Sequence, residues 1–489
     1  MPYSVGLHSA AAAFLSAGFA TQFTIAVLAF LFIVTLISAF EKEGVDEPKH
    51  LPGFSFSHIL PFFTRRYDFL NWGIQASGSN IYQFKLFRNT VIVVSGERAR
   101  QAYFSAKNFD LTEGFKILSG AIPMVRGVTS DLQTKRVVTI HKRLGNIQRN
   151  VPLSSLFPYL LEDTRKCMDS WGQSGKFDPF DKVYELVFQL TIRCLSSTEI
   201  ADSPELVARL KVLYDKLDNG TTPATVLLPW LPTPAMIKKL WATKEIYDIV
   251  TKAIRDREAS GIVRDDTLQM LLDSSDEKLV VVGFIMGLIT AGARATGSMA
   301  SWVFTFLGGH QDWRSKATSE VESLLARYSN NAGDHLDSEA KKDPIPVSTR
   351  LGLIPLEAWE SETPVLDAII RETTRLAQPH TAMRRNLGPD TYIDGRIIPS
   401  GAYVIYPFSD VHLDPEIYPD PWRFDPSREQ VKDIPFTYIG WGGGKWLLLA
   451  ISREHVRSRY WQLIFVFLVC VAFSTRLAST LVFGCFATD

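Results

Sequence analysis

Three consecutive glycines, Gly442 to Gly444, lie between Trp441 and Lys445 in the C-terminal part of the chain. Glycine lacks a Cβ atom, so such a run lets the backbone pass close to a flat ligand. The next residues are Trp446 and the leucines Leu447–Leu449, none of which offers a lone pair to a metal ion. The stretch therefore predicts a loop that approaches a flat ligand but holds no metal.

Two charged residues upstream can pair on a helix. Glu372 and Arg375 stand three residues apart in the segment IIRETTRL, so they share one helix face. A second arginine, Arg423, lies in the proline-rich segment PDPWRFDP between aromatic residues that can partly bury it. A buried arginine needs a carboxylate partner, whereas an exposed ion pair stabilises a fold little. Both interpretations of these residues are open at this point.

The order of these features resembles that of the cytochromes P-450, which are haem-thiolate monooxygenases. It consists of an ExxR helix, short strands, a P-x-R-F segment and an aromatic-Gly-x-Gly loop. The resemblance covers nearly the whole chain up to Lys445. The sequences QPHTAMRRN and GWGGGK are most similar to those of fungal microsomal members. It implies the cytochrome P-450 fold, mainly α with small β sheets (α+β). It also implies that Glu372, Arg375 and Arg423 form a structural triad that braces the haem loop.

The resemblance further implies a haem cofactor, an apolar small-molecule substrate of terpenoid, sterol or fatty acyl type, and an NADPH-dependent flavoprotein reductase as partner. The cofactor-binding residues that it implies on the loop are Trp441, Gly442, Gly444 and Lys445. Arg384 is the candidate partner of a haem propionate, with Arg385 as the alternative, because a basic fork suits a carboxylate. The basic residues at 141–143 could also contact a propionate, or simply face solvent.

The cysteine that ligates the iron in this family falls on Leu448, and the last glycine of the motif falls on Ala450. Thiolate donation is what favours O–O bond cleavage, and leucine cannot supply it. Cys470 and Cys485 follow no glycine loop and precede no helix that could favour a thiolate, so neither is a good substitute. We therefore predict no metal ligand in this chain.

Residues 448–489 do not match the helix and the terminal hairpin that follow the cysteine in the family. A reading-frame or splice change near Lys445 explains the abrupt departure, and a divergent tail is the alternative. Two functions therefore stay open. One is a membrane-bound haem monooxygenase; the other is a catalytically inactive, truncated or frame-shifted relative, which the missing ligand favours for the chain as written.

The helix expected to activate oxygen, Gly283–Trp302, also departs from the family pattern. Arg294 stands where an acid is expected, and the hydroxyl of Thr296 comes one position late. One residue turns a helix by about 100°, so Thr296 need not face the iron. Gly292 permits a close approach to a flat ligand, and together with Thr296 it is a catalytic candidate. A buried helix of small residues is the alternative, and descent from a haem isomerase that rearranges peroxides stays open.

The N-terminal run Phe23–Phe40 carries no charge and, at about 1.5 Å per residue, is long enough to span a bilayer core. No basic residue precedes it and no small-x-small cleavage site follows it, so a membrane anchor is favoured over a signal peptide. The basic residues come after the run, which predicts a cytosolic body on the endoplasmic reticulum membrane. The segment TVLLPWLPTPAMIKKLW could add a membrane contact or pack into the core.

Composition excludes other classes of function. The chain has 52 basic and 52 acidic residues among 489, and no basic run stands out, so no nucleic-acid partner is expected. Its four cysteines show no CxxC spacing, which argues against a zinc site and a disulfide framework.

The chain pattern predicts its organisation. Strands are predicted at 81–87, at 91–95 and within 393–406, with helices dominating from 97 to about 376 and loops at 218–234 and 330–346. The predicted domains are an N-terminal segment (1–22), a transmembrane anchor (23–40), a proline-containing hinge (41–65), a catalytic domain (66–447) and an atypical hydrophobic tail (448–489).

Overall fold

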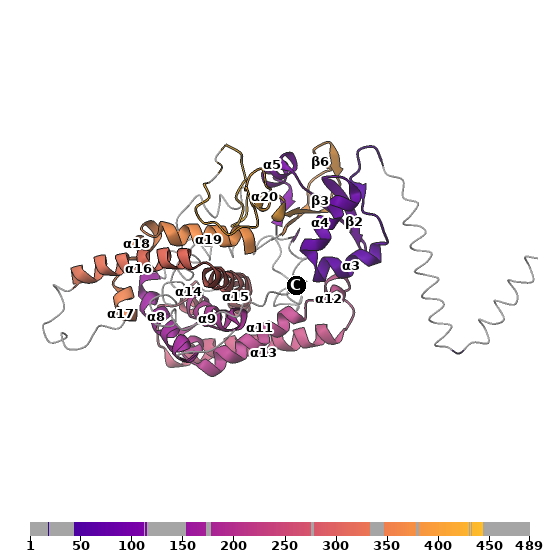
Figure 1. The fold of residues 1–489 in the computed structure, drawn as a ribbon. Coiled ribbons are helices and arrows are strands. Elements are labelled where there is room, and N and C mark those ends of the chain that lie inside the picture. The colour runs from indigo at the N-terminus through magenta and orange to yellow at the C-terminus, as the bar shows by residue number, and fades with distance from the viewer. Residues whose placement is uncertain are drawn as a thin grey trace, which may run out of the picture. The chain divides into compact units, whose positions relative to one another are not determined.

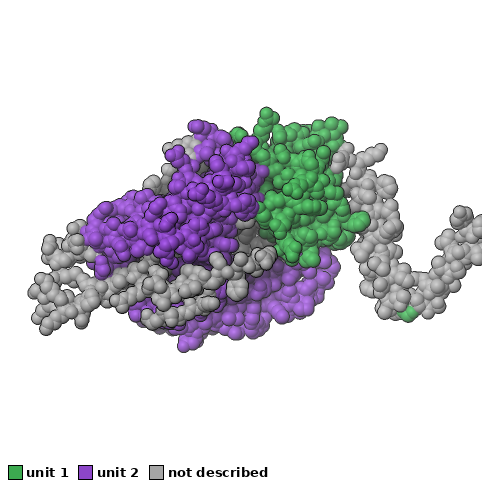
Figure 2. Space-filling view, in the orientation of Figure 1, with its two compact units in different colours: residues 1–114, 383–407 green, residues 115–382, 408–489 purple. Residues whose placement is uncertain are grey.

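The computed structural model describes residues 44–111, 113–114, 153–172, 178–274, 278–332, 347–377, 381–429, 431 and 433–443, together with Gly18. Helices dominate these residues, and most of the strands gather in two small sheets (Figure 1). The chain divides into two compact units: unit 1 comprises residues 1–114 and 383–407, and unit 2 comprises residues 115–382 and 408–489 (Figure 2). The predicted anchor and the predicted tail lie outside the described residues.

Unit 1 is built on a six-stranded sheet with the strand order β1-β2-β3-β8-β5-β4. In chain order the strands are β1 (Lys49–His50), β2 (Ile81–Leu86), β3 (Asn89–Val94), β4 (Phe109–Asp110), β5 (Thr381–Asn386) and β8 (Tyr403–Pro407). The antiparallel pair of β2 and β3 confirms the strands predicted at 81–87 and 91–95. Residues 91–94 are fully buried, as an uninterrupted run of valine and isoleucine predicts for a strand covered on both faces.

A second hairpin, β6 (Thr391–Ile393) and β7 (Arg396–Ile398), turns at Asp394 and Gly395. Both turn residues have a positive φ, 44° and 75°, which is the backbone that an Asp-Gly pair favours in a tight hairpin. With β8, this hairpin confirms the strands predicted near 393–406.

Three helices pack on the strands of unit 1. α3 (Ser55–Thr64) and α4 (Arg66–Ser77) contact β2, and α5 (Glu97–Ser105) contacts β3 and β6. The segment predicted as a hinge differs from the prediction: Lys49 and His50 pair in parallel with Tyr82 and Gln83 of β2. Sheet pairing therefore orders part of a segment whose prolines alone had indicated a linker.

Unit 2 is a helical body. Its helices are α8 (Leu153–Asp169), α9 (Pro179–Leu195), α10 (Thr198–Ala201), α11 (Pro204–Asn219), α12 (Pro223–Leu227), α13 (Pro234–Ser260), α14 (Thr267–Asp273), α15 (Lys278–Gly309), α16 (Gln311–Ala332), α17 (Val347–Gly352), α18 (Leu356–Ser361), α19 (Pro364–Ala377) and α20 (Ser409–His412). Four of these helices start with a proline that follows a capping side chain, and the caps are Asp178, Ser203, Thr222 and Thr233.

The two loops predicted in this part of the chain differ from the structure. The helix α12 lies inside the 218–234 stretch, so the prediction of a continuous loop there is wrong. α16 likewise extends to Ala332, three residues into the second predicted loop, whose remainder lies outside the described residues.

α15 is the central helix of unit 2, and it contacts α9, α13, α14, α16 and α19 (Figure 1). Its side chains join two hydrophobic cores, Met299 and Val303 in the first and Ile285 and Ile289 in the second. Within the described part of the chain, α15 alone is long and apolar enough to cross a membrane, judged by length and composition. The packing of α15 against five neighbouring helices explains its apolar composition without a membrane.

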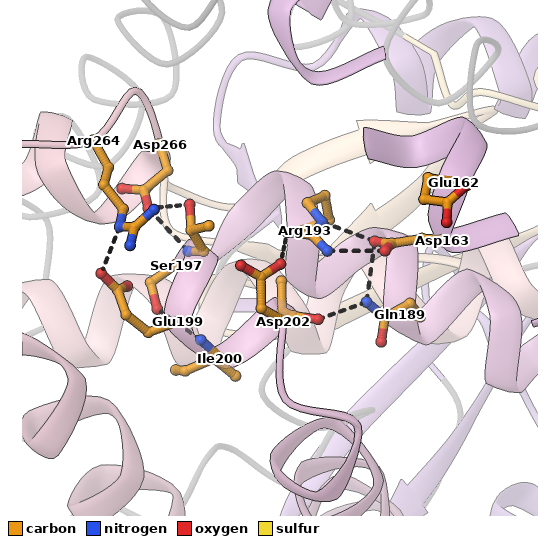
Figure 3. A network of polar contacts seen from close by, with 12 residues as sticks. Glu162, Asp163, Gln189, Arg193, Ser197, Glu199, Ile200, Asp202, Arg264 and Asp266 are labelled. Carbon is orange, nitrogen blue, oxygen red and sulfur yellow. Dashed lines mark hydrogen bonds and ion pairs between the residues drawn. The ribbon is translucent and has the colours of Figure 1, made fainter. Parts of the chain in front are cut away.

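Buried arginine networks connect the helices of unit 2 (Figure 3). Arg193 of α9 donates to both carboxylate oxygens of Asp163 at 2.8 Å and to Asp202 at 2.6 Å. Asp266, the N-cap of α14, pairs at 2.5 Å with Arg257 of α13. Because a buried charge that loses its partner is strongly destabilising, these networks fix the relative positions of the helices.

Candidate functional site

α19 carries the predicted Glu372–Arg375 pair on its buried face. Nε and Nη2 of Arg375 donate to the two carboxylate oxygens of Glu372, both at 2.8 Å, and the two side chains are 1% and 5% exposed. Nη1 of Arg375 donates to the backbone carbonyls of His412 at 2.6 Å and Pro421 at 2.7 Å. The pair is therefore a buried fork of charge-assisted hydrogen bonds that holds two later segments of unit 2 against α19.

The third member of this network is Arg428, and the prediction of Arg423 is wrong. Arg428 Nε donates to Glu372 Oε1 at 3.2 Å, and the Arg428 side chain is 14% exposed. The Arg423 side chain is 71% exposed and reaches only Asp425, at 4.0 Å. The physical reason lies in the backbone: the N–H of Asp425 donates to Glu372 Oε1 at 3.0 Å. That contact places the chain against the carboxylate two residues after Arg423, which is left facing solvent.

A cavity of about 50 Å³ lies beside this network and is lined by Arg371, Glu372, Tyr418, Arg428 and Tyr438, among others. Burial raises the pKa of Tyr438 far above its usual value, so its phenol stays neutral. A cavity of this size holds a few water molecules but no cofactor ring. The network is a structural brace for the segments that follow.

The glycine loop starts next to this brace. The backbone N–H of Ile439 donates to Nε2 of His412 at 3.1 Å, and the ring of Tyr438 stacks on the same imidazole. A Cβ atom at Gly440 would lie 2.5 Å from the Tyr438 hydroxyl and 2.6 Å from Thr374. Glycine is therefore required at 440 by close packing against α19.

The predicted cofactor-binding residues on the loop are described only in part. Gly442 has a φ of 93°, a backbone conformation that glycine adopts readily and other residues rarely. Trp441 is 41% exposed. Gly444, Lys445 and the ligand position Leu448 lie outside the described residues. At position 448 the residue type alone is established, and leucine cannot ligate iron.

The two candidates on α15 have different surroundings. Gly292 is buried and Thr296 is half-buried. Arg294, in the position of the expected acid, forms an ion pair with Asp218 of α11. A Cβ atom at Gly297 would lie 2.5 Å from the ring of Tyr184 on α9, so at this position α15 packs closely against another helix. A catalytic role for Gly292 or Thr296 stays a prediction.

Arg384 lies in unit 1 and is only 4% exposed. Its Nη1 donates to the backbone carbonyl of Tyr103 at 3.0 Å, and its guanidinium lies 4.8 Å and 5.4 Å from the ring centroids of Tyr103 and Phe104. Burial lowers the pKa of Arg384. The alternative, Arg385, is more exposed and lies 3.6 Å from Glu113. A propionate contact by either arginine stays a prediction, and residues 141–143 lie outside the described residues.

The donor set does not fit a thiolate-ligated haem iron. Cys167 and Cys194 are the cysteines of the described residues. Burial raises the pKa of each thiol to about 12, so neither forms a thiolate at neutral pH. The described part of the chain also brings no three His, Cys, Asp or Glu side chains together as a metal site. With leucine at position 448, no ligand is assigned.

Comparisons with known proteins agree with the sequence pattern. The sequence model of the family described as Cytochrome P450 matches residues 75–445, so the match ends three residues before Leu448. The Cytochrome P450 monooxygenase AacuE of Aspergillus aculeatus is 28% identical over 401 residues, which cover 78% of this chain and 78% of that protein. The Lanosterol 14-alpha demethylase of Mus musculus is 26% identical over 431 residues, which cover 82% of this chain and 78% of that protein.

One solved structure shares the fold. The chain named "Retinoic acid bound cyanobacterial CYP120A1" matches with a TM-score of 0.67 at 22% identity, and the match covers 88% of this chain and 92% of that one. This likeness confirms the predicted fold class, a mainly helical body with small sheets.

Proposed function

Because this chain belongs to the cytochrome P450 family, we propose that it is a relative of the membrane-bound haem monooxygenases that has lost the iron ligand, and with it the oxidation reaction. The observation that carries the proposal is leucine at position 448, where the ligand cysteine of the family falls. The positions of Cys167 in α8 and Cys194 in α9 support it, because neither thiol belongs to the glycine loop. Glu372 still pairs with Arg375, and Arg428 completes the network, so a brace beside the cofactor loop is present although the ligand is not.

The reaction of the lineage is the oxidation of an apolar small molecule of terpenoid, sterol or fatty acyl type. The relatives support this class: several are named as fungal monooxygenases, and others are named as demethylases of lanosterol. Electrons for such a reaction come from an NADPH-dependent flavoprotein reductase. In this chain Arg384 is the candidate for a propionate, and the small residues of α15 are the candidates for the face beside the ring.

The location that fits this lineage is the endoplasmic reticulum membrane, with Phe23–Phe40 as a single anchor and the body in the cytosol. Exposed apolar side chains between α12 and the middle of α13 would add a second membrane contact: Trp230, Ile237 and Trp241 are 75%, 58% and 51% exposed. Protease added to intact microsomes should then digest the body. Full protection of the body would contradict this orientation.

The decisive experiment compares three proteins: the chain as written, Leu448→Cys, and a chain in which everything after Lys445 is replaced by a family-like Cys-x-Gly segment, helix and hairpin. Each is reduced, exposed to carbon monoxide and examined for the thiolate-haem Soret band. We expect no band from the first, little from the second because residues 449–489 do not match the family either, and a clear band from the third. A third protein that retains haem without the band would show that the scaffold no longer supports thiolate ligation.

A further inference from the structure

One face of α15 is left uncovered in the middle of this otherwise buried helix. Residues of this open strip recur at spacings of three and four, and none of them is buried: Gly283, Gly287, Thr290, Arg294 and Ser298. A Cβ atom at Gly287 would meet no atom within 4 Å, so there is open space beside the strip. A core helix therefore keeps an accessible strip several turns long.

Arg294 is the charged residue of the open strip. Its side chain is 63% exposed and forms an ion pair with Asp218, whose side chain is 36% exposed. Asp218 lies in the last turn of α11, where the helix dipole makes a negative charge unfavourable. The Asp218 carboxylate therefore does not stabilise α11. An exposed pair contributes only about 0–1 kcal/mol to stability. The pair can therefore open at little cost when another carboxylate competes for Arg294.

A second cation, Lys239 of α13, interacts with the same carboxylate. The residue is only 4% exposed. Burial lowers the pKa of Lys239, while the negative charge of Asp218 acts in the opposite direction. Further charges nearby are paired with one another, since Lys211 lies 3.8 Å from Asp181 and 3.6 Å from Asp215. The Nζ of Lys239 donates to the Thr221 hydroxyl at 3.2 Å, so the cation that forms an ion pair with Asp218 is Arg294.

We propose that Arg294 binds the carboxylate of an otherwise apolar substrate, and that Asp218 occupies Arg294 until that carboxylate replaces it. This inference rests on the proposed function and narrows its substrate class to a carboxylic acid with a long apolar body. A guanidinium donates two parallel hydrogen bonds to a carboxylate, a geometry that Asp218 and a substrate acid can both use. Gly287 leaves room for the apolar body beside α15.

Measurements of ligand binding test the proposed role of Arg294 without any need for haem or turnover. The full chain is placed in phosphatidylcholine nanodiscs and titrated calorimetrically with laurate and with its uncharged methyl ester, and empty nanodiscs are subtracted. Arg294→Gln removes the proposed cation. Asp218→Asn removes the competing carboxylate and leaves the cation. Arg327→Gln is the matched control, because Arg327 is 61% exposed and also pairs with an acid, Glu362, elsewhere in unit 2.

The three variants have different expected results. Arg294→Gln should weaken laurate binding about tenfold, the factor that ~1.4 kcal/mol gives, and leave the ester unchanged. Asp218→Asn should tighten laurate binding by up to about fivefold, the factor that corresponds to the cost of opening an exposed pair. Arg327→Gln should change neither. A purely structural ion pair predicts instead that Arg294→Gln and Asp218→Asn lower the melting temperature alike and leave laurate binding as it is.

The outcomes also separate this inference from the proposed function. If the unmodified chain binds laurate and the ester equally well and Arg294→Gln changes neither, the carboxylate assignment is overturned while an apolar site remains. If the unmodified chain binds neither compound, the apolar substrate class of the proposed function fails with it. Tighter laurate binding by Asp218→Asn supports the assignment, because loss of a structural contact does not increase affinity for an anion.

Discussion

Arg428→Gln should lower the free energy of unfolding by about 2–4 kcal/mol, whereas Arg423→Gln should change it by less than about 0.5 kcal/mol. Arg423 lies in the proline-rich segment and Arg428 lies two residues after its end. The side chains of Arg428 and Arg423 are 14% and 71% exposed. They therefore form a matched pair that differs chiefly in burial. The comparison tests which arginine completes the brace on α19.

The magnitude follows from the contacts of Arg428. Its Nε donates to Glu372 at 3.2 Å, and its two Nη atoms donate to the carbonyls of Pro419 at 2.5 Å, Asp420 at 2.8 Å and Arg423 at 3.1 Å. A hydrogen bond that involves a charged group contributes about 1.5–3 kcal/mol net. Glutamine can remake part of this set, and Glu372 keeps its main partner in α19, so the loss stays well below the sum of the four bonds.

Urea denaturation of the full chain in detergent, followed by tryptophan fluorescence, measures both variants. A shift of the midpoint at constant slope reports a change in stability rather than in the surface exposed on unfolding. Equal losses for the two variants, or the larger loss for Arg423→Gln, would refute the assignment of the brace to Arg428.

Three further changes test the packing and the charges of unit 2. Glu372→Ala leaves the buried Arg375 without its carboxylate and should cost about 3–5 kcal/mol or prevent folding; a stable variant with normal urea resistance would contradict burial of the pair. Gly297→Ala should cost about 1–3 kcal/mol, because its Cβ would lie 2.5 Å from a tyrosine ring. Gly287→Ala, on the open strip, should instead stabilise by about 0.5–1 kcal/mol in thermal unfolding; the same sign for both glycine variants would contradict the packing. Burial raises the pKa of Asp266, but hydrogen bonds outweigh it and hold the pKa below 3.8. The stabilisation by this carboxylate is therefore present at neutral pH and is lost as the pH falls through the folded-state pKa. Asp266→Asn should flatten the acid limb of a plot of melting temperature against pH, and an unchanged limb would argue against it.

Local features of the site are predictable from the sequence, and non-local ones are not. The pairing of Glu372 with Arg375 follows from a spacing of three residues on one helix. The choice between Arg423 and Arg428 does not follow from spacing, because a Pro-x-Arg pattern ends at both positions. It depends on where the backbone of Asp425 meets α19, a contact between residues 53 positions apart. A pattern search finds both arginines, but the fold decides which is buried.

The helix starts at two prolines and the partner of Arg294 also show which features a sequence can and cannot predict. Pro223 and Pro234 indicate a loop when the sequence is considered alone, yet each is the first residue of a helix. In both cases a threonine N-cap directly precedes the proline, and this Thr-Pro pair is the sequence signal for the start of a helix. Arg294 is visible in the sequence as a departure from the family pattern. Its partner is not, because Asp218 lies 76 positions away on another helix. The family itself was predictable, because its motifs are short and ordered along the chain, and the family match confirms it.

The missing thiolate is the central claim, and one spectrum tests it most directly. The unmodified chain, expressed with haem available, is reduced and exposed to carbon monoxide. We predict no thiolate-haem Soret band, because position 448 carries leucine and because Cys167 and Cys194 lie in α8 and α9, outside the glycine loop. A thiolate band from this chain would contradict the account, since a cysteine such as Cys470 or Cys485 would then have to reach the iron.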